Sequence, residues 1–372
     1  MRDPMKLLFC IKALANPAGG AERVLTDIAN GLAMRGHAVS LLTFEPPGRQ
    51  SFYPLDTAVR HIGLGIGSTT TSARPRETLQ RIGALRNIAK REQPHIVIGF
   101  MHSIFMPLGL ALLGTGIPLI ASEHNVPAHY GGRPLQRALL RLMPLLAHRI
   151  TCVSEQAGSA YPAGLRRVMV PVPNPVTVSG AARAEVVGTE CKTLLAVGRL
   201  HPQKDYATLI AAFGLLAREF PDWALRIVGD GEERPMLERQ IAAAGLADRI
   251  ALPGSTTQIA REYLGAQFFV TSSLYESFGL TTAEALTHGL PVVGFADCPG
   301  TNELIADGVN GVLVDPGEDR AASLARALRP VMADSGVRLR LASCPRRLPE
   351  RFRLENVLDR WEALIAEACS HG

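Results

Sequence analysis

The sequence lacks the features that mark metal centres, disulfide frameworks and dinucleotide sites. Its six cysteines are spread over 372 residues without a Cys-x-x-Cys pair. This pattern fits a reducing compartment and argues against a metal knuckle or a disulfide scaffold. Neither half opens its first helix with Gly-x-Gly-x-x-Gly, which disfavours a Rossmann-type dehydrogenase.

Long apolar runs and aromatic residues are also scarce. The longest apolar segment, residues 104–120, contains two prolines and three glycines, so it is a poor membrane-spanning helix. The short run at residues 7–11 is not followed by an export cleavage pattern, and we expect a cytoplasmic protein. Aromatic residues make up 5% of the chain. They provide no stacking platform for nucleic acid, although the pI is near 9.0.

Charge is distributed unevenly along the chain. Residues 1–180 hold 19 Lys and Arg against 9 Asp and Glu, whereas the remainder holds 20 against 25. A basic first half favours an anionic surface, either lipid head groups or nucleic acid.

Within that basic half, residues 133–150 are predicted to form an amphipathic helix kinked by Pro144. Arg133, Arg137 and Arg141 recur at a spacing of four, and another face carries leucines at positions 135, 139, 142 and 146. Such a helix can lie on an anionic membrane surface. It can equally be a surface helix that packs its leucines into its own domain and leaves the arginines in water.

Strand-like and helical segments alternate through both halves, which predicts parallel sheets with helices on both faces. A proline cluster at residues 171–175, followed by a segment of low periodicity to about residue 190, indicates a domain boundary. We therefore expect one domain at 1–175, a second at 190–350, and a closing amphipathic helix at 351–372. A cleft between the two domains is the expected ligand site.

Two loops of the first half follow predicted strands and carry candidate site residues. Gly19 and Gly20 lie between a strand at 6–11 and a helix at 21–32. They let the backbone approach a ligand closely, although a plain tight turn has the same pattern. His124, in Ser122-Glu-His-Asn125, follows a strand at 118–122, and ligands of open α/β sheets bind at such strand ends. It can donate a hydrogen bond to a substrate or have only a structural role.

The second half has a charged loop of the same kind. Arg199 and Lys204 lie between a predicted strand at 193–197 and a helix at 206–220. Cations in such a loop can meet a diphosphate, arginine as a fork and lysine as a point charge. Each is also an ordinary surface charge when considered alone.

A later turn carries two carboxylates. Glu276 follows a strand at 268–272, and Glu284 lies in the helix that begins after the turn. The backbone amides of Phe278, Gly279 and Leu280 suit phosphate oxygens, because free N–H groups and the positive helix end point at an anion. A phosphorylated sugar or nucleotide is the expected ligand, and an ordinary turn with two solvated acids is the alternative.

Taken in chain order, these motifs resemble those of retaining glycosyltransferases of family 4, which have the GT-B fold of two Rossmann-like parallel-sheet α/β domains facing a cleft. The resemblance spans nearly the whole chain and rests on Glu276-x7-Glu284, Gly198-Arg-Leu with Lys204-Asp205, Val228-Gly-Asp-Gly231, Gly19-Gly20 and Ser122-Glu-His-Asn125. A finer resemblance is to bacterial enzymes that add galactose or N-acetylgalactosamine to lipid-linked oligosaccharides or exopolysaccharides. It rests on Ser122-Glu-His-Asn125 and on Phe295-Ala-Asp-Cys-Pro-Gly300 with Glu303, although Ser277 stands where those relatives often have glycine.

The resemblance implies roles in the second domain. Arg199 and Lys204 would bind the donor diphosphate, and Glu284 would hold the ribose hydroxyls. Glu276, with the amides of residues 278–280, would hold the transferred sugar and its phosphate. Gly229 is predicted to line the same donor site.

It also implies roles in the first domain. His124 would face the transferred sugar, and Gly19 and Gly20 would lie under the diphosphate near the acceptor. The C-terminal helix would cross back onto this domain.

Retention in this family is thought to proceed by front-face substitution, in which the leaving phosphate takes the acceptor proton and no protein nucleophile is needed. The resemblance therefore implies a hexosyltransferase with a UDP-linked donor, no cofactor and no metal, because no Asp-x-Asp motif appears. A lipid-linked or growing polysaccharide acceptor is expected, with peripheral contact to the inner face of the plasma membrane through Arg133, Arg137 and Arg141, and no nucleic-acid partner.

Three alternatives are weighed against this interpretation. One is a GT-B glycosyltransferase or sugar-phosphate synthase with a soluble acceptor. A second is a non-catalytic nucleotide-binding Rossmann protein. A glycosidase with paired glutamates is disfavoured, because it has no use for phosphate-binding amides beside one carboxylate.

Overall fold

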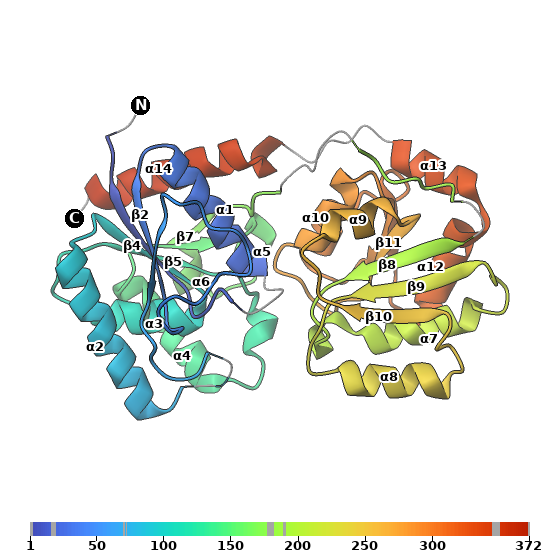
Figure 1. Cartoon of the computed structure of the whole chain (residues 1–372), viewed down its shortest axis with the longest axis horizontal. Helices are drawn as coiled ribbons and strands as arrows, with labels where there is room; N and C mark the ends of the chain where they lie inside the picture. The colour runs from blue at the N-terminus through green and yellow to red at the C-terminus, as the bar shows by residue number, and fades with distance from the viewer. Residues whose placement is uncertain are drawn as a thin grey trace. The chain divides into compact units, whose positions relative to one another are not determined.

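The computed structural model describes residues 3–15, 20–69, 71, 73–176, 182–188, 191–343 and 350–370. The chain divides into two compact units, Met1–Pro175 with Arg351–Gly372, and Val176–Glu350 (Figure 1). Each unit is built on one parallel sheet. The last helix therefore belongs to the first unit, although it follows the second in sequence.

The first unit has a seven-stranded parallel sheet in the order β3-β2-β1-β4-β5-β6-β7. The inner strands of this sheet are short apolar runs that are largely buried, as expected where helices cover a parallel sheet, whereas the edge strands β3 and β7 are at most half-buried. The strands are β1 (Lys6–Cys10), β2 (Ala38–Thr43), β3 (Arg60–Gly63), β4 (Ile96–Phe100), β5 (Leu119–Ser122), β6 (Arg149–Cys152) and β7 (Met169–Pro171).

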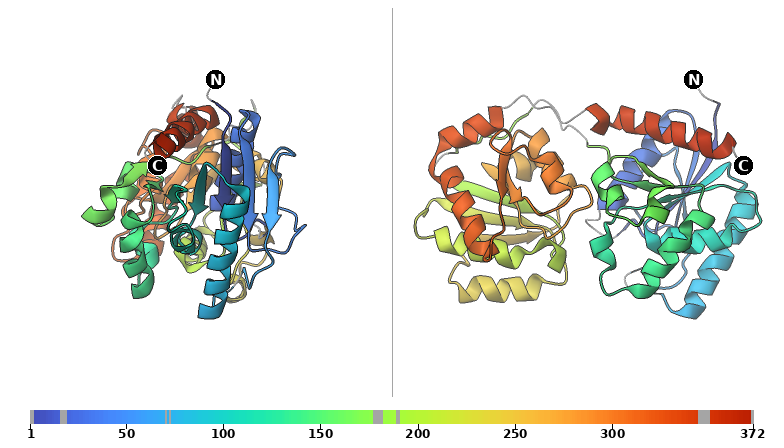
Figure 2. Two further views of the ribbon diagram at one scale, coloured as in Figure 1. Left: turned by 90° about the vertical axis from the view of Figure 1, so that its left-hand side faces the viewer. Right: turned by 180° about the vertical axis from the view of Figure 1, so that it is seen from behind.

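Helices of very different length connect these strands. They are α1 (Gly20–Met34), α2 (Pro75–Glu92), α3 (His102–Ala111), α4 (Pro134–Leu142), α5 (Glu155–Ser159), α6 (Ala163–Arg166) and α14 (Leu354–Ser370), with 3-10 turns η1 (Pro127–Tyr130), η2 (Met143–Leu145) and η4 (Glu350–Phe352). Helix α14 lies alongside α1 (Figure 2). Gly31 permits this packing, because a Cβ at that position would lie 2.5 Å from the Leu358 side chain.

The segment at 133–150 differs from the single kinked helix predicted for it. Helix α4 ends at Leu142, Pro144 lies in the 3-10 turn η2, and Ile150 already belongs to β6. Before Ile150, the buried side chains of this segment are those of Leu140, Met143 and Ala147. The alternative in which the leucine face packs into the domain is wrong for Leu135, Leu139 and Leu142, which are exposed, whereas Leu146 is half-buried and packs against the core.

The second unit has a six-stranded parallel sheet in the order β10-β9-β8-β11-β12-β13. Its strands are β8 (Lys192–Val197), β9 (Trp223–Val228), β10 (Ile250–Gly254), β11 (Phe268–Thr271), β12 (Val292–Phe295) and β13 (Gly311–Val314). Its helices are η3 (Pro202–Lys204), α7 (Tyr206–Leu216), α8 (Arg234–Ala243), α9 (Ile259–Leu264), α10 (Leu280–Thr287), α11 (Thr301–Leu304), α12 (Arg320–Ala333) and α13 (Ser335–Ser343).

Each sheet has its own apolar core. In the second unit, Trp223 packs edge-on against Phe268 with ring centroids 5.2 Å apart, and both side chains are buried with those of α7 and α12. In the first unit, Trp361 of α14 stacks on Phe100 of β4, with centroids 6.0 Å apart. Among the described residues, none of the helices has the length and apolar character needed to cross a bilayer.

Candidate functional site

The strand order of the second unit indicates where its ligands bind. From β8, the sheet continues through β9 to β10 on one side and through β11 and β12 to β13 on the other. The strand order therefore reverses between β8 and β11. In open parallel sheets, ligands bind outside the carboxyl ends of the strands at this reversal point. Gly198 follows the residue at which β8 ends, and Ser272 follows the end of β11. The two charged loops predicted from the sequence therefore lie at the same sheet edge.

Lys204 and Glu276 form an ion pair at this point. The Lys204 Nζ lies 2.5 Å from Glu276 Oε1, and the two side chains are 17% and 12% exposed. Ser273 Oγ donates to the same carboxylate oxygen over 2.7 Å, and Ser272 Oγ donates to the Lys204 carbonyl over 2.7 Å. Because an ammonium has three donors, Lys204 can meet a further anion while it remains paired with Glu276.

Arg199 adds a second cation beside this pair. It is exposed and, within the described ranges, has no carboxylate partner. A guanidinium in this state is available for bidentate binding of phosphate oxygens.

Gly229 has a packing role at the same edge. Its φ is +146°, and a Cβ there would lie 2.0 Å from the Gly198 carbonyl oxygen. Only glycine therefore lets the loop after β9 approach the loop that carries Arg199. The predicted contact of Gly229 with a ligand stays a prediction.

The turn after Glu276 leads into the amino end of α10. Gly279 has a φ of +80° and immediately precedes α10, so the chain reverses direction before Leu280 begins the helix. Gly300 packs under this turn, because a Cβ there would lie 2.9 Å from both the Glu276 carbonyl oxygen and the Phe278 nitrogen. The first N–H groups of α10 have no intrahelical acceptor, which makes this end of the helix suitable for an anion.

Glu284 lies in the second turn of α10 and is 4% exposed. Its Oε2 accepts a hydrogen bond from the Tyr263 hydroxyl over 2.8 Å. Tyr263 is a partner that the sequence analysis missed, since it lies on α9 and no local pattern links the two residues. The predicted role of Glu284 as a ribose ligand stays a prediction.

In the first unit, His124 follows β5, as the strand-end argument required. Its Nε2 lies 3.0 Å from Ser122 Oγ, and its ring stacks on Phe100 with centroids 4.8 Å apart. Burial lowers the pKa of His124 to about 4. The imidazole is therefore neutral near pH 7 and can donate or accept a hydrogen bond without adding charge.

Hydrogen bonds to the Glu123 side chain stabilise the turn that carries His124. This buried carboxylate accepts hydrogen bonds from the Tyr130 hydroxyl and from the Asn125 backbone nitrogen, the latter over 2.8 Å. Burial raises the pKa of Glu123. The Tyr161 hydroxyl donates to the Asn125 carbonyl over 2.9 Å, so two tyrosines fix the turn on either side of His124.

His102 is a site residue that the sequence analysis missed. It begins α3 directly after β4, and its Nδ1 lies 3.5 Å from the Asn125 side-chain nitrogen. Burial, followed by the nearby charges of His129, Arg133 and Lys12, lowers the pKa of His102 to about 4. The preceding Met101 has a φ of +71°, an uncommon conformation for a residue with a side chain. His102 also lies just past the carboxyl end of a strand, which is the signal in the sequence that identified His124.

The glycine loop is only partly described. Gly20 is the exposed first residue of α1, and Gly19 lies outside the described residues. The strand order of this sheet reverses between β1 and β4, which places the loop after β1 beside His102. Lys12, in that loop, donates to the Thr71 carbonyl over 2.9 Å.

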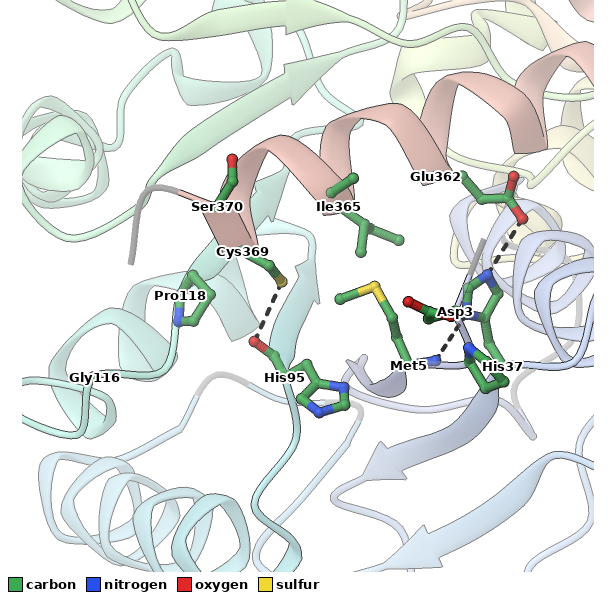
Figure 3. Close-up of a pocket in the computed structure, with 12 residues that line it drawn as sticks. Asp3, Met5, His37, His95, Gly116, Pro118, Glu362, Ile365, Cys369 and Ser370 are labelled. Carbon is green, nitrogen blue, oxygen red and sulfur yellow. Dashed lines mark hydrogen bonds and ion pairs between the residues drawn. The ribbon is translucent and has the colours of Figure 1, made fainter. Parts of the chain in front are cut away.

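A cavity of about 810 Å³ lies at the opposite edge of the first sheet (Figure 3). Met5, His37 and His95 line it at the amino ends of β1, β2 and β4, and Glu362 of α14 lies 3.2 Å from His37 Nε2. Ligands of parallel sheets bind at the carboxyl edge, and none of the predicted site residues lines this cavity.

Comparison with known proteins gives a consistent result for both halves. The family described as Glycosyltransferase Family 4 matches residues 18–179, and the one described as Glycosyl transferases group 1 matches residues 182–345. The D-inositol 3-phosphate glycosyltransferase of Geodermatophilus obscurus is 30% identical, over 93% of this chain and 84% of the relative. The lipopolysaccharide core biosynthesis glycosyltransferase LpsE of Rhizobium meliloti is 26% identical, over 94% of this chain and 96% of the relative.

A solved structure supports the fold independently. The Anabaena protein Alr3699/HepE, crystallised in complex with UDP and glucose, matches with a TM-score of 0.77 and 22% identity, covering 97% of this chain and 99% of that one. The predicted fold class, GT-B with two parallel-sheet α/β domains, is confirmed.

Proposed function

Because this chain belongs to the glycosyltransferases of family 4 and group 1, we propose that it transfers a hexose or an N-acetylhexosamine from a UDP-linked donor, with retention and without a metal. The proposed acceptor is a lipid-linked or growing polysaccharide in cell-envelope glycan synthesis. The structure of the Anabaena protein with UDP and glucose and the name of the Rhizobium relative support the donor class and the pathway class.

The observation that carries the proposal is the partly buried Lys204–Glu276 pair at the strand-order reversal of the second unit. Sugar transfer builds negative charge on the departing diphosphate, and fixed cations lower the energy of that charge in the transition state. Lys204 and Arg199 supply the cations, and the amino end of α10 supplies N–H groups. Glu276 holds the Lys204 ammonium in place and offers its other oxygen to a sugar hydroxyl.

A neutral histidine suits the transfer step. In front-face substitution the leaving phosphate takes the acceptor proton, so the protein needs neither a nucleophile nor a charged general base. His124, with its pKa lowered to about 4, would hydrogen-bond the transferred sugar without attracting the donor diphosphate into a competing ion pair.

We further propose that α4 brings the protein to an anionic membrane. Arg133, Arg137 and Arg141 are exposed, and the exposed fractions of Leu135 and Leu145 are 71% and 81%. An isolated exposed leucine needs no explanation, but several beside a row of arginines are typical of interfacial helices. Vesicles with anionic lipid should sediment the protein at low salt and release it at high salt. Equal sedimentation with neutral vesicles would contradict this.

The test of the function is a UDP-release assay over a panel of UDP- and GDP-sugars, with a short-chain polyprenyl-diphosphate oligosaccharide as acceptor. We expect release with one UDP-hexose or UDP-N-acetylhexosamine, dependent on the lipid acceptor, and an α-linked product by NMR. Release that depends only on a soluble sugar phosphate would overturn the lipid-linked acceptor. Failure of any nucleotide sugar to bind would overturn the donor assignment.

A further inference from the structure

A second cavity in the first unit is not used by the roles described above. It has a volume of about 400 Å³ and lies between α4, the turn η1 and the segment that joins α5 to α6. Arg137 and Arg141 of α4 line it together with an apolar wall that includes Leu140, Leu165 and the rings of Tyr130 and Tyr161. Pockets of this size accept part of a small organic ligand.

The two arginines give the cavity an affinity for anions. Residues four apart on a helix lie side by side, so the guanidinium groups of Arg137 and Arg141 can meet the same ligand. Both are exposed and, in the part of the chain that the structure describes, neither pairs with a carboxylate. Arginine forks match phosphate oxygens.

The remaining wall has few polar atoms to offer a sugar. The Tyr130 hydroxyl donates a hydrogen bond to Glu123, and the Tyr161 hydroxyl donates one to the Asn125 carbonyl. Their rings, with Leu140 and Leu165, therefore present an apolar surface. A pocket that joins paired arginines to an apolar wall fits a molecule with a phosphate at one end of a hydrocarbon chain.

The same hydrogen bonds place the cavity next to the turn that carries His124. Both tyrosine hydroxyls donate hydrogen bonds to residues that flank His124, namely Glu123 and Asn125. An acceptor with a short glycan brings its carrier lipid close to the sugar that reacts, and therefore close to this turn, whereas a phospholipid of the bilayer carries no glycan for the transfer. Leu135 and Leu139 lie on the opposite face of α4, where they are exposed.

We propose that this cavity binds the acceptor's carrier lipid, with its phosphate or diphosphate on Arg137 and Arg141 and the first part of its hydrocarbon chain against Leu140, Leu165 and the two tyrosine rings. The inference rests on the proposed lipid-linked acceptor and adds a binding site to it.

The experiment measures binding of farnesyl diphosphate by isothermal titration, with saturating UDP present to occupy the donor diphosphate site. We expect Arg137→Ala with Arg141→Ala to weaken binding about tenfold or more, because two charge-assisted contacts are lost. Ala160→Phe, at an exposed position that lines the cavity, should weaken it similarly by filling the chain site. Arg133→Ala is the matched control, since Arg133 belongs to the same arginine row but does not line the cavity.

Three further ligands separate the sources of affinity. Pyrophosphate tests the head group, farnesol tests the chain, and a soluble short-chain phosphatidylglycerol, which forms no membrane surface, tests a bilayer lipid; each should compete poorly with farnesyl diphosphate. Equal loss in Arg133→Ala, full competition by pyrophosphate or by the phosphatidylglycerol, or unchanged binding in Ala160→Phe would each overturn the proposal. If these results appear while UDP-sugar turnover is intact, the pocket assignment alone fails. Loss of UDP-sugar binding would count against the proposed function instead.

Discussion

The two units share a strand order and differ in the chemistry at their carboxyl edges. Both sheets place their first strand beside their fourth, with the second and third strands outward on one side. The second unit puts charged groups at the reversal, with Lys204 paired to Glu276 and Arg199 exposed beside them. The first puts imidazoles there whose pKa values are near 4. The sheet sets the position of a site, and the loop side chains set its function.

The largest expected effect is at the charged site of the second unit. Lys204→Ala should lower turnover about 1000-fold, because loss of one fixed donor to developing charge costs about 4 kcal/mol in the transition state. The measurement is UDP release under saturating donor, with thermal unfolding as a check on folding. Lys192→Ala is the control, since Lys192 pairs with Asp222 elsewhere in the same unit. Near-normal turnover in Lys204→Ala would remove the residue from the site.

The next largest effect is expected at the neutral histidine of the first unit. His124→Ala should lower transfer about 100-fold, within the range for loss of a positioned hydrogen-bonding group, while UDP affinity stays within about twofold. His95→Ala is the control, because His95 lies at the amino edge of the same sheet. A large loss of UDP affinity in His124→Ala would place this residue in the nucleotide site instead.

A third prediction concerns pH and the first unit. The pKa of the His124 imidazole is about 4 in the folded protein and about 6.5 in an unfolded chain. Between these values the unfolded chain binds more protons, so stability present above pH 6.5 is lost as pH falls towards 4. His102, whose pKa is also about 4, contributes to the same loss. The share of His124 in the loss from pH 7 to pH 5 should be about 2 kcal/mol, measured by urea unfolding.

Comparison with a variant isolates this contribution. His124→Ala should reduce the change in unfolding free energy between pH 7 and 5 by about that amount. Glu123 acts in the opposite sense, because its raised pKa gives stability at low pH that is lost as pH rises through the folded value. An identical pH slope in wild type and variant would contradict the assignment.

The smallest effect concerns the buried carboxylate of the second unit. Glu284→Ala should weaken UDP binding about tenfold, equivalent to about 1.4 kcal/mol. Tyr263→Phe removes the hydrogen bond of 2.8 Å but keeps the carboxylate, so its effect on UDP affinity should be smaller. Titration of UDP into both variants makes the comparison, and unchanged affinity in Glu284→Ala would exclude it as a nucleotide ligand.

Much of the fold was predictable because its signals are local. Buried parallel strands are short apolar runs, and helices between them show their own periodicity. The prediction failed where packing between elements decided the outcome. Leu135, Leu139 and Leu142 of α4 are more apolar than Ala147 in the same segment, yet they are exposed and Ala147 is buried. Pro144 indicates an interruption of the helix, but no local pattern says which side chains face the core on either side of it.

The sequence by itself determined the alternating architecture, the resemblance to its family, and the placement of His124, Arg199, Lys204 and Glu276 in loops after strands. These depend on residue type, spacing and order, which are one-dimensional properties. Only the tertiary structure joined Lys204 to Glu276, Glu284 to Tyr263, and His102 to the turn of His124. Such contacts link residues far apart in the chain or on separate elements, because parallel strands bring distant loops to one sheet edge through the packing of the whole unit.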